Sequence, residues 1–203
     1  MTNRGRPPLL SDETILEQAL AAFAEDGFTA MSVRALNAKL GLSHETISKR
    51  FGSKSELFCA AVAHGFALFN ADFSSGLTDG SPTNDLERLR VTIRAFMIAI
   101  SRHPTLGALL HHPSIDEKQR NLLISETGLG EQISATASLL TRLHAAGVIH
   151  ETRIRELWVL AEGAVTPLHF HELSQMFDVF DGPINRDNHI ARMTDIIMRS
   201  MLI

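Results

Sequence analysis

Apolar residues recur at helical spacing through most of the chain. The pattern is clearest after Lys54, where the apolar positions are Phe58, Val62, Phe66, Phe69 and Phe73. Their spacing of i, i+4, i+8, i+11 and i+15 places them on one face of a long helix. No segment alternates apolar and polar residues in the manner of a half-buried strand. The sequence therefore predicts an all-α protein.

Three short helices are predicted ahead of this long helix. Ser11 is expected to cap the first helix and Gly27 to end it, while Ser32 begins the second. Gly41 makes a tight turn, and Ser43 is expected to cap a third helix. Two helices, a tight turn and a further helix within about 40 residues form the three-helix version of the helix-turn-helix.

The segment from Gly41 to Leu57 has the features of a DNA-reading element. Its apolar positions can point inward, which leaves a small polar and basic outer face suited to the major groove. Ser53 and Glu56 have the S-x-x-E spacing of a capping box and begin the long helix.

The remainder of the chain predicts further helices. Residues 74–85 are rich in turn-forming residues, and the helix after them is stopped by Pro104. Ser114 and Glu117 predict a second capping box, and Thr152 is expected to cap a later helix. The last helix has a stripe of apolar residues between positions 190 and 201.

We divide the chain into three parts on this basis. Residues 1–10 form a flexible basic arm, residues 11–55 a helix-turn-helix DNA-binding domain, and residues 56–203 a helical domain for effector binding and dimerisation. The arm contains Arg4 and Arg6, which either reach DNA or belong to a frayed terminus.

The charge distribution supports a local DNA contact rather than a polycation. The net charge is −4, yet the segment from Arg34 to Lys54 has five basic residues and only one acid, Glu45. A basic face on an otherwise acidic protein is typical of a phosphate-contacting module attached to something else.

Composition places few further limits on function. The chain has 203 residues and 44% hydrophobic content, enough for a buried core. Its single cysteine, Cys59, is interpreted as a small core residue. The N-terminus does not resemble a signal peptide, and we identify no run of apolar residues long enough to span a membrane. We therefore expect a cytoplasmic protein that does not bind a membrane.

The first 60 or so residues resemble the TetR family of bacterial transcriptional regulators. The resemblance is carried by the arm GRPP, the helix end AFAEDGF, and the motifs MSVRAL, GLSHETISKRF and SKSEL. The order, spacing and apolar positions of these motifs all agree with the family. The later part of the chain is similar only in being helical and of suitable length.

The resemblance implies a non-enzymatic homodimer that binds a palindromic operator in double-stranded DNA. It implies that a small-molecule effector, at least partly apolar, binds the C-terminal domain and releases a repressor from its operator. The last two long helices would form the dimer interface, and no cofactor is expected. Three residues depart from the family pattern. Ser48 stands in place of a tyrosine, Asn37 in place of an alanine, and Leu40 in place of another small residue.

Candidate DNA contacts lie in the arm, in the helix-turn-helix and at the start of the long helix. Those residues are Arg4, Arg6, Arg34, Ser43, His44, Glu45, Thr46, Ser48, Lys49 and Lys54. Lys54 is expected to bind phosphate at a helix N-terminus, while His44, Glu45 and Thr46 lie where base edges are read.

Candidate effector contacts are aromatic, aliphatic or imidazole side chains of the C-terminal domain. Those residues are Phe66, Phe69, Phe96, Met97, Ile100, His103, Leu109 and Trp158. The competing interpretation is that they belong to the apolar core.

Two alternative functions remain at this stage. The ten histidines suggest an all-α metal-binding sensor or hydrolase, although His169 and His171 would point in different directions from a helix. We expect no metal site. The other alternative is a regulator without a small-molecule effector, which works through protein contacts.

Overall fold

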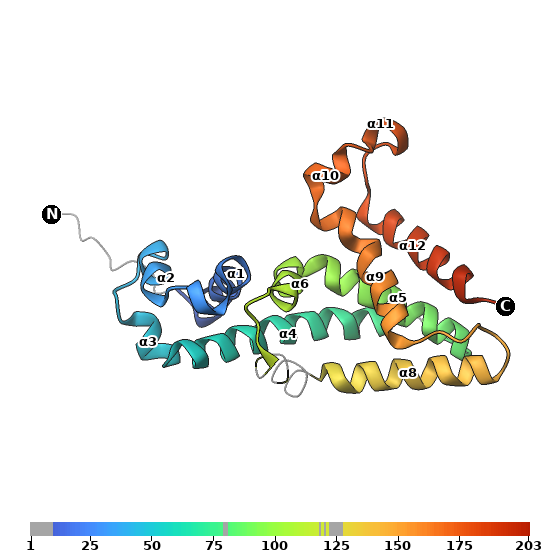
Figure 1. The fold of residues 1–203 in the computed structure, drawn as a ribbon, viewed down its shortest axis with the longest axis horizontal. Helices are drawn as coiled ribbons and strands as arrows, with labels where there is room; N and C mark the ends of the chain where they lie inside the picture. The colour runs from blue at the N-terminus through green and yellow to red at the C-terminus, as the bar shows by residue number, and fades with distance from the viewer. Residues whose placement is uncertain (1–9, 79–80, 118, 120, 122–127) are drawn as a thin grey trace.

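The protein is all-α, as predicted. The computed structural model describes residues 10–78, 81–117, 119, 121 and 128–203 (Figure 1). Within these residues the only β-type pairing is an isolated bridge between Ile149 and Leu202. The helices are α1 (Asp12–Ala30), α2 (Val33–Lys39), α3 (Thr46–Phe51), α4 (Lys54–Thr78), α5 (Asp85–Arg102), α6 (Pro104–His111), α8 (Leu129–Ala145), α9 (Ile154–His169), α10 (His171–Gln175), α11 (Asp178–Asp181) and α12 (Arg186–Met201).

Helices α1 to α3 form a compact head at one end of the molecule (Figure 1). Ser11 caps α1 as predicted, because its side chain accepts a hydrogen bond from the Thr14 N–H. Phe23, Phe28 and Phe58 pack ring against ring beneath the head, with centroids 5.0–5.9 Å apart. This aromatic cluster attaches the head to the start of α4.

The predicted end of α1 at Gly27 is wrong in detail. Gly27 has φ 74° and ψ 167°, which breaks the helical geometry, but the helix resumes and runs to Ala30. Helix α6 and the turn after it pack against this kink, where the Ser114 hydroxyl accepts a hydrogen bond from the Phe28 N–H at 3.0 Å. Ser114 therefore links the body to the head.

Two capping-box predictions have different outcomes. The Ser53–Glu56 capping box is confirmed, with the Ser53 N–H donating to Glu56 Oε2 at 2.7 Å. The box at Ser114 and Glu117 is wrong, because Asp116 and Gln119 exchange the reciprocal bonds.

The predicted N-cap of α9, Thr152, is also wrong. Arg153 is the N-cap residue, and the Thr152 hydroxyl donates instead to the His150 carbonyl.

Helix α4 is the central element that connects the head to the body. Its apolar stripe is buried as predicted, with Phe58, Val62, Phe66, Phe69 and Phe73 each no more than 5% exposed. By length and hydropathy alone α4 is able to cross a membrane, contrary to the expectation from sequence. Its buried stripe nevertheless packs against α1 and α5, which is the behaviour of a core helix.

The body is built around α5, which packs on α4, α8, α9 and α12. Two side chains at the C-terminal end of α5 tie it to α4. The Asp72 carboxylate lies 2.8 Å from His103 Nε2 and 2.6 Å from Arg102 Nη1. Burial acts to raise the pKa of Asp72, but the hydrogen bonds from His103 and Arg102 outweigh it and hold that pKa below its usual value.

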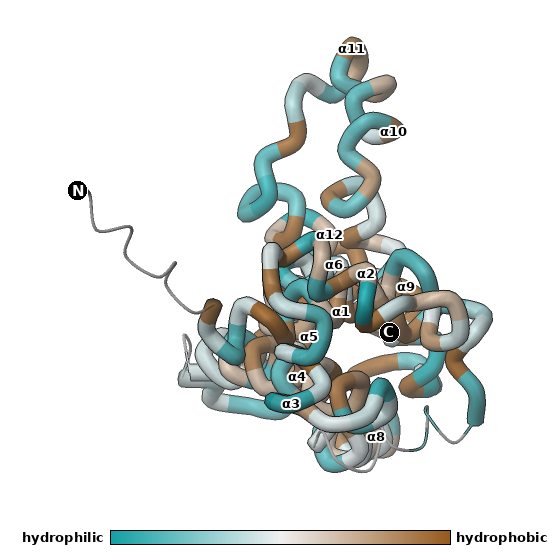
Figure 2. Tube along the Cα trace, turned by 90° about the vertical axis from the view of Figure 1, so that its left-hand side faces the viewer, coloured by the Kyte–Doolittle hydropathy of each residue, from teal (hydrophilic) through white to brown (hydrophobic). Residues whose placement is uncertain are grey.

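Residues 170–182, which we call the projection, join α9 to α12 and include α10 and α11. The projection stands clear of the rest of the molecule (Figure 2). Its large apolar side chains are exposed, and they are Phe170, Leu173, Met176, Phe177, Val179 and Phe180. An apolar surface of this kind on a folded chain indicates an interaction site.

Candidate DNA interface and effector pocket

Helix α3, the predicted recognition helix, presents a polar face to solvent. Ile47 is fully buried beneath it, whereas His44, Glu45, Ser48 and Lys49 are exposed. Arg34 on α2 and Ser43 in the turn are also exposed, and Thr46 is half-buried. The structure therefore brings these predicted DNA contacts together in the head; Arg4 and Arg6 lie outside the described residues.

The predicted Ser43 cap is wrong. Helix α3 begins at Thr46, and its N-cap residue is Glu45, whose side chain makes no capping hydrogen bond. The Ser43 hydroxyl instead lies 2.6 Å from the Thr46 hydroxyl, and the Ser43 carbonyl accepts the Thr46 N–H. The serine hydroxyl therefore bonds to a side chain rather than to the backbone of the helix.

The exposed Lys49 and Glu45 form an ion pair across one turn. Lys49 Nζ lies 2.8 Å from Glu45 Oε2, and both side chains are more than 70% exposed. Such a pair is held weakly in water, so either side chain can turn to a nucleic acid.

Lys54 has intramolecular partners in this structure. Its Nζ donates to the Thr29 carbonyl at 3.0 Å and lies 5.2 Å from the centroid of the Phe28 ring. The ammonium group therefore sits at the C-terminal end of α1, where a positive charge complements the helix dipole.

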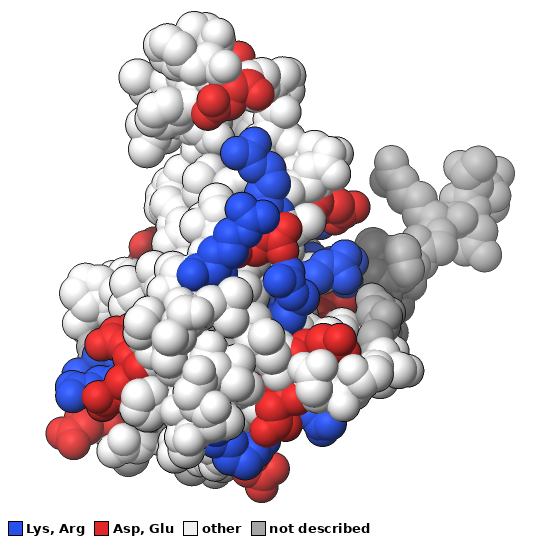
Figure 3. Space-filling view, turned by 90° about the vertical axis from the view of Figure 1, so that its right-hand side faces the viewer, with Lys and Arg blue, Asp and Glu red and all other residues white. Residues whose placement is uncertain are grey.

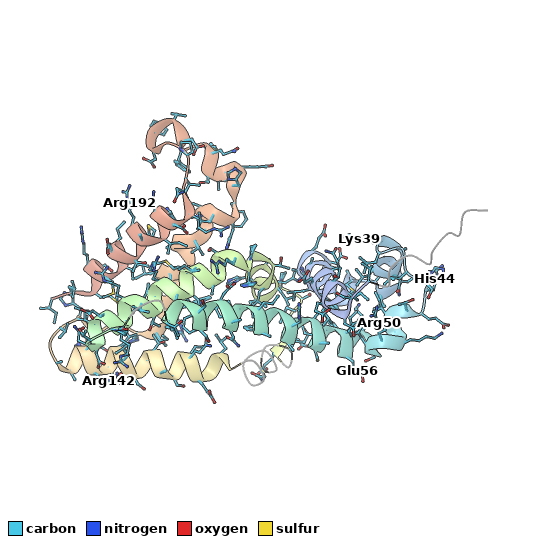
Figure 4. The ribbon with its side chains drawn as sticks, turned by 180° about the vertical axis from the view of Figure 1, so that it is seen from behind. Lys39, His44, Arg50, Glu56, Arg142 and Arg192 are labelled. Atoms are coloured by element: carbon cyan, nitrogen blue, oxygen red, sulfur yellow. The ribbon has the colours of Figure 1, made fainter. Side chains whose placement is uncertain are left out.

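Arg50 is a structural residue that sequence reasoning did not single out. It belongs to α3, and its side chain reaches the start of α1, while His44 lies at the outer end of the head (Figure 4). Its guanidinium group donates to the Leu10 carbonyl at 2.8 Å and pairs with Asp12 at 2.8 Å. Arg50 thus fixes the start of α1 against α3. No local sequence signal marks this role, since the partners are about 40 positions away.

An apolar cavity of about 280 Å³ opens between α4, α5, α8 and α9. Of the predicted effector contacts, Phe96 and Trp158 line it. The lining residues that sequence reasoning missed are Phe73, Thr92, Ile93, Leu129, Gln132, Ile133, Thr136, Ile154, Arg155, Leu157 and Ala161. Phe73 belongs to the apolar stripe of the long helix that the sequence identified, but it was not among the predicted effector contacts.

The other predicted effector contacts lie away from this cavity. Phe66, Phe69, Met97, Ile100 and Leu109 are buried in the core, at most 8% exposed. His103 borders a separate cavity of about 210 Å³ near α1, α4 and α6.

Polar groups at the cavity are few. The Thr92 and Thr136 hydroxyls donate to carbonyls of their own helices, and Gln132 donates to Asn70. Arg155 is the charged residue among those that line the cavity, and it is exposed. At the outer side, the Trp158 ring stacks on His111 with centroids 5.9 Å apart. The cavity is therefore suited to an apolar molecule with one polar or anionic end.

No metal centre is found among the histidines that the structure describes. Within the described ranges, no three His, Cys, Asp or Glu side chains are placed to share an ion. His103 pairs with Asp72, His111 with Glu162, and His189 with the Ala164 carbonyl.

The compact three-helix head with its exposed third helix has the helix-turn-helix arrangement, and a helical body follows it. Comparisons with known proteins agree. The sequence model described as "Bacterial regulatory proteins, tetR family" matches residues 15–61. The matched segment contains most of the three-helix head, so this part of the chain is similar to the tetR family.

Relatives extend this similarity beyond the head. An uncharacterised HTH-type transcriptional regulator of Mycobacterium tuberculosis, strain H37Rv, is 28% identical over 138 residues. The match covers 61% of this chain and 66% of the relative, so it spans just under two thirds of that protein. A Mycobacterium bovis regulator is similar to the same extent.

Solved structures share the fold over nearly the full length. The TetR family regulator PfmR from Thermus thermophilus has a TM-score of 0.63 at 22% identity, covering 94% of this chain and 97% of PfmR. AibR, in complex with isovaleryl coenzyme A and operator DNA, has a TM-score of 0.64 at 19% identity, covering 90% of this chain and 95% of AibR. At these identities the similarity concerns the fold.

Proposed function

We propose that this protein is a dimeric repressor that a small-molecule effector releases from its operator. The observation that carries the proposal is the position of the apolar cavity relative to α4. This helix begins at Lys54, directly after the recognition helix, and contributes Phe73 to the cavity wall. Phe73 lies 19 positions after Lys54, which corresponds to about 28 Å of continuous helix. A displacement at Phe73 is therefore transmitted to the head.

DNA binding is assigned to the exposed face of α2 and α3. Phosphate contacts by Arg34 and Lys49 would supply much of the affinity, and this makes binding salt-dependent. His44 and Glu45 lie at the end of α3 that meets base edges. A two-fold dimer would place two such helices in successive major grooves, about 34–36 Å apart, on a palindromic site.

The dimer interface is assigned to α9 and α12. Val159 on α9 and Ile196 on α12 are at least 50% exposed, and the apolar projection joins these two helices. Acidic side chains gather at the tip of the projection and basic ones on the face below it (Figure 3). In a two-fold dimer the same surface of both protomers forms the interface. If that surface includes both the projection and the basic face, the acidic tip of each projection would lie against the basic face of the partner.

The effector is expected to be an apolar molecule with one polar or anionic group directed to Arg155. The structural neighbour AibR has been solved in complex with isovaleryl coenzyme A and operator DNA. A protein of this fold that binds both kinds of ligand supports the assignment of an effector here. The cavity also favours an effector-binding regulator over one that works through protein contacts alone.

Selection of bound duplexes from random DNA tests the DNA-binding function. We expect a palindrome with two half-sites whose centres are one helical turn apart. Recovery of no enriched sequence, or of a single half-site, would refute the dimeric operator assignment.

Sedimentation of interface variants tests the dimer. Phe180→Asp and Val159→Asp are expected to shift the protein toward monomer, because each places a charge in an apolar contact. Leu77→Asp on α4, which is also exposed (37%) but lies outside α9, α12 and the projection, is the matched control. A wild-type monomer, or equal effects in all three variants, would contradict the assigned interface.

A further inference from the structure

Asn37 is a buried polar residue whose side chain joins two helices of the head. It is 0% exposed. The other buried polar side chains in the described part of the chain, Ser101 and Thr194, bond to carbonyls of their own helices. Asn37 differs because its amide reaches from α2 to the turn and to α3.

The Asn37 side chain makes three hydrogen bonds. Nδ2 donates to the Val33 and His44 carbonyls, each at 3.1 Å, and Oδ1 accepts from the Ile47 N–H at 3.2 Å. In addition, the Asn37 main-chain carbonyl accepts from the Leu42 N–H at 2.8 Å. Asn37 therefore forms hydrogen bonds to α2, to the turn after it and to the start of α3.

Helix α3 needs this external partner. The first N–H groups of a helix have no partner within it, and a side chain at the N-cap position normally supplies one. The Glu45 side chain does not do so, and the Ser43 hydroxyl is paired with Thr46. Ile47 is fully buried, so water cannot reach its N–H. Asn37 Oδ1 fills this role from the neighbouring helix.

We propose that Asn37 is a positioning residue that sets the orientation of the recognition helix and thereby the sequence preference of DNA binding. The site requires two donors and one acceptor on a short side chain, which is the chemistry of an asparagine amide. An aspartate of the same shape would retain the acceptor but place negative charge against two carbonyl oxygens. The inference rests on the DNA-reading role proposed above for α3.

Substitution of Asn37 can separate an effect on the placement of α3 from an effect on the folding of the head. Alanine is favourable inside a helix, and Asn37→Ala leaves the apolar core of the head, including the buried Leu36 and Ile47, intact. We therefore expect Asn37→Ala to fold, with α3 held less firmly. Ser101→Ala, which removes a buried hydroxyl from α5, is the matched control.

Hydrogen exchange tests the contact without any DNA. Exchange of the Ile47 amide should be about tenfold faster in Asn37→Ala than in wild type, since one buried hydrogen bond corresponds to roughly one factor of ten. It should be unchanged in Ser101→Ala. Equal protection of Ile47 in wild type and Asn37→Ala would overturn the capping role.

DNA binding tests the consequence for sequence preference. The probes are a duplex selected by the wild-type protein from random DNA and a shuffled duplex of the same length. Asn37→Ala should bind the selected duplex about tenfold more weakly, with little change for the shuffled duplex, and Asn37→Asp should lose more. Circular dichroism at the assay temperature measures the folded fraction of each variant.

The outcomes separate this inference from the proposed function. Parallel losses on both duplexes that follow the folded fraction would reduce Asn37 to a stability role and refute positioning. A wild-type protein that selects no DNA, but whose Ile47 amide loses protection in Asn37→Ala, would refute the proposed function and retain the capping contact.

Discussion

Replacement of Gly27 by alanine tests the junction between the head and the body. Gly27 has φ 74° and ψ 167°, a region of backbone space that is essentially restricted to glycine. A Cβ atom at this position would lie 2.2 Å from His112 Cε1 and 2.3 Å from the Ser114 Oγ atom. Both the backbone and the packing therefore oppose a side chain.

The expected cost has two parts. The backbone strain is about 1–3 kcal/mol. Displacement of Ser114 would also break its bond to the Phe28 N–H, and an unsatisfied donor costs about 1–3 kcal/mol. The sum of roughly 2–6 kcal/mol is a large share of a typical stability of about 5–15 kcal/mol.

Urea denaturation followed by circular dichroism measures this cost, and two other glycines provide controls. Gly41 has φ 66° with open space around it, so Gly41→Ala reports backbone strain alone, about 1–2 kcal/mol. Gly107 lies inside α6 with open space, so Gly107→Ala should stabilise by about 0.5–1 kcal/mol. If Gly27→Ala costs no more than Gly41→Ala, the inferred close packing of α6 on α1 is refuted.

Three further predictions concern DNA, the cavity and pH. Lys54→Ala should flatten the dependence of log binding constant on log salt by roughly one unit; an unchanged slope would limit Lys54 to its contact with the Thr29 carbonyl. Trp158, the single tryptophan, should change its emission when 8-anilinonaphthalene-1-sulfonate enters the cavity, and an equal signal from Thr136→Phe, which fills the cavity, would place the probe elsewhere. The Ser53 N–H, and then its hydroxyl, lower the pKa of Glu56 from its usual 4.5. A carboxylate whose folded-state pKa is lowered stabilises the protein above the unfolded pKa, and this is lost as pH falls through the folded value. Wild type should therefore exceed Glu56→Gln in stability above the usual pKa of 4.5, with the difference fading on acidification in urea titrations; a difference that grows at low pH would contradict this.

Local patterns along the chain predicted most of the helices correctly. The stripe from Phe58 to Phe73 required one buried face, and the Ser53–Glu56 box needed only a partner three residues away. Both features depend on spacing within a helix, so they can be recognised in one segment of sequence. The same holds for the exposed face of α3, which follows from the burial of Ile47.

Hydrogen-bonding side chains with a choice of partners were predicted less well. Ser43, Ser114 and Thr152 were each expected to cap a helix, and each bonds elsewhere. Short hydroxyl side chains can satisfy several nearby groups, and tertiary contacts decide between them. The bonds of Asn37 across the turn and the distant partners of Arg50 were likewise absent from any helical pattern.

The amino-acid sequence by itself determined the all-α class, the helix-turn-helix head and the long apolar helix after it, because helical periodicity is a local property. Only the tertiary structure decided where the cavity lies. Phe66 and Phe73 share one stripe of α4, yet Phe73 lines the cavity and Phe66 lies in the core. That difference depends on which other helices lie beside each part of α4, and periodicity within α4 carries no information about it.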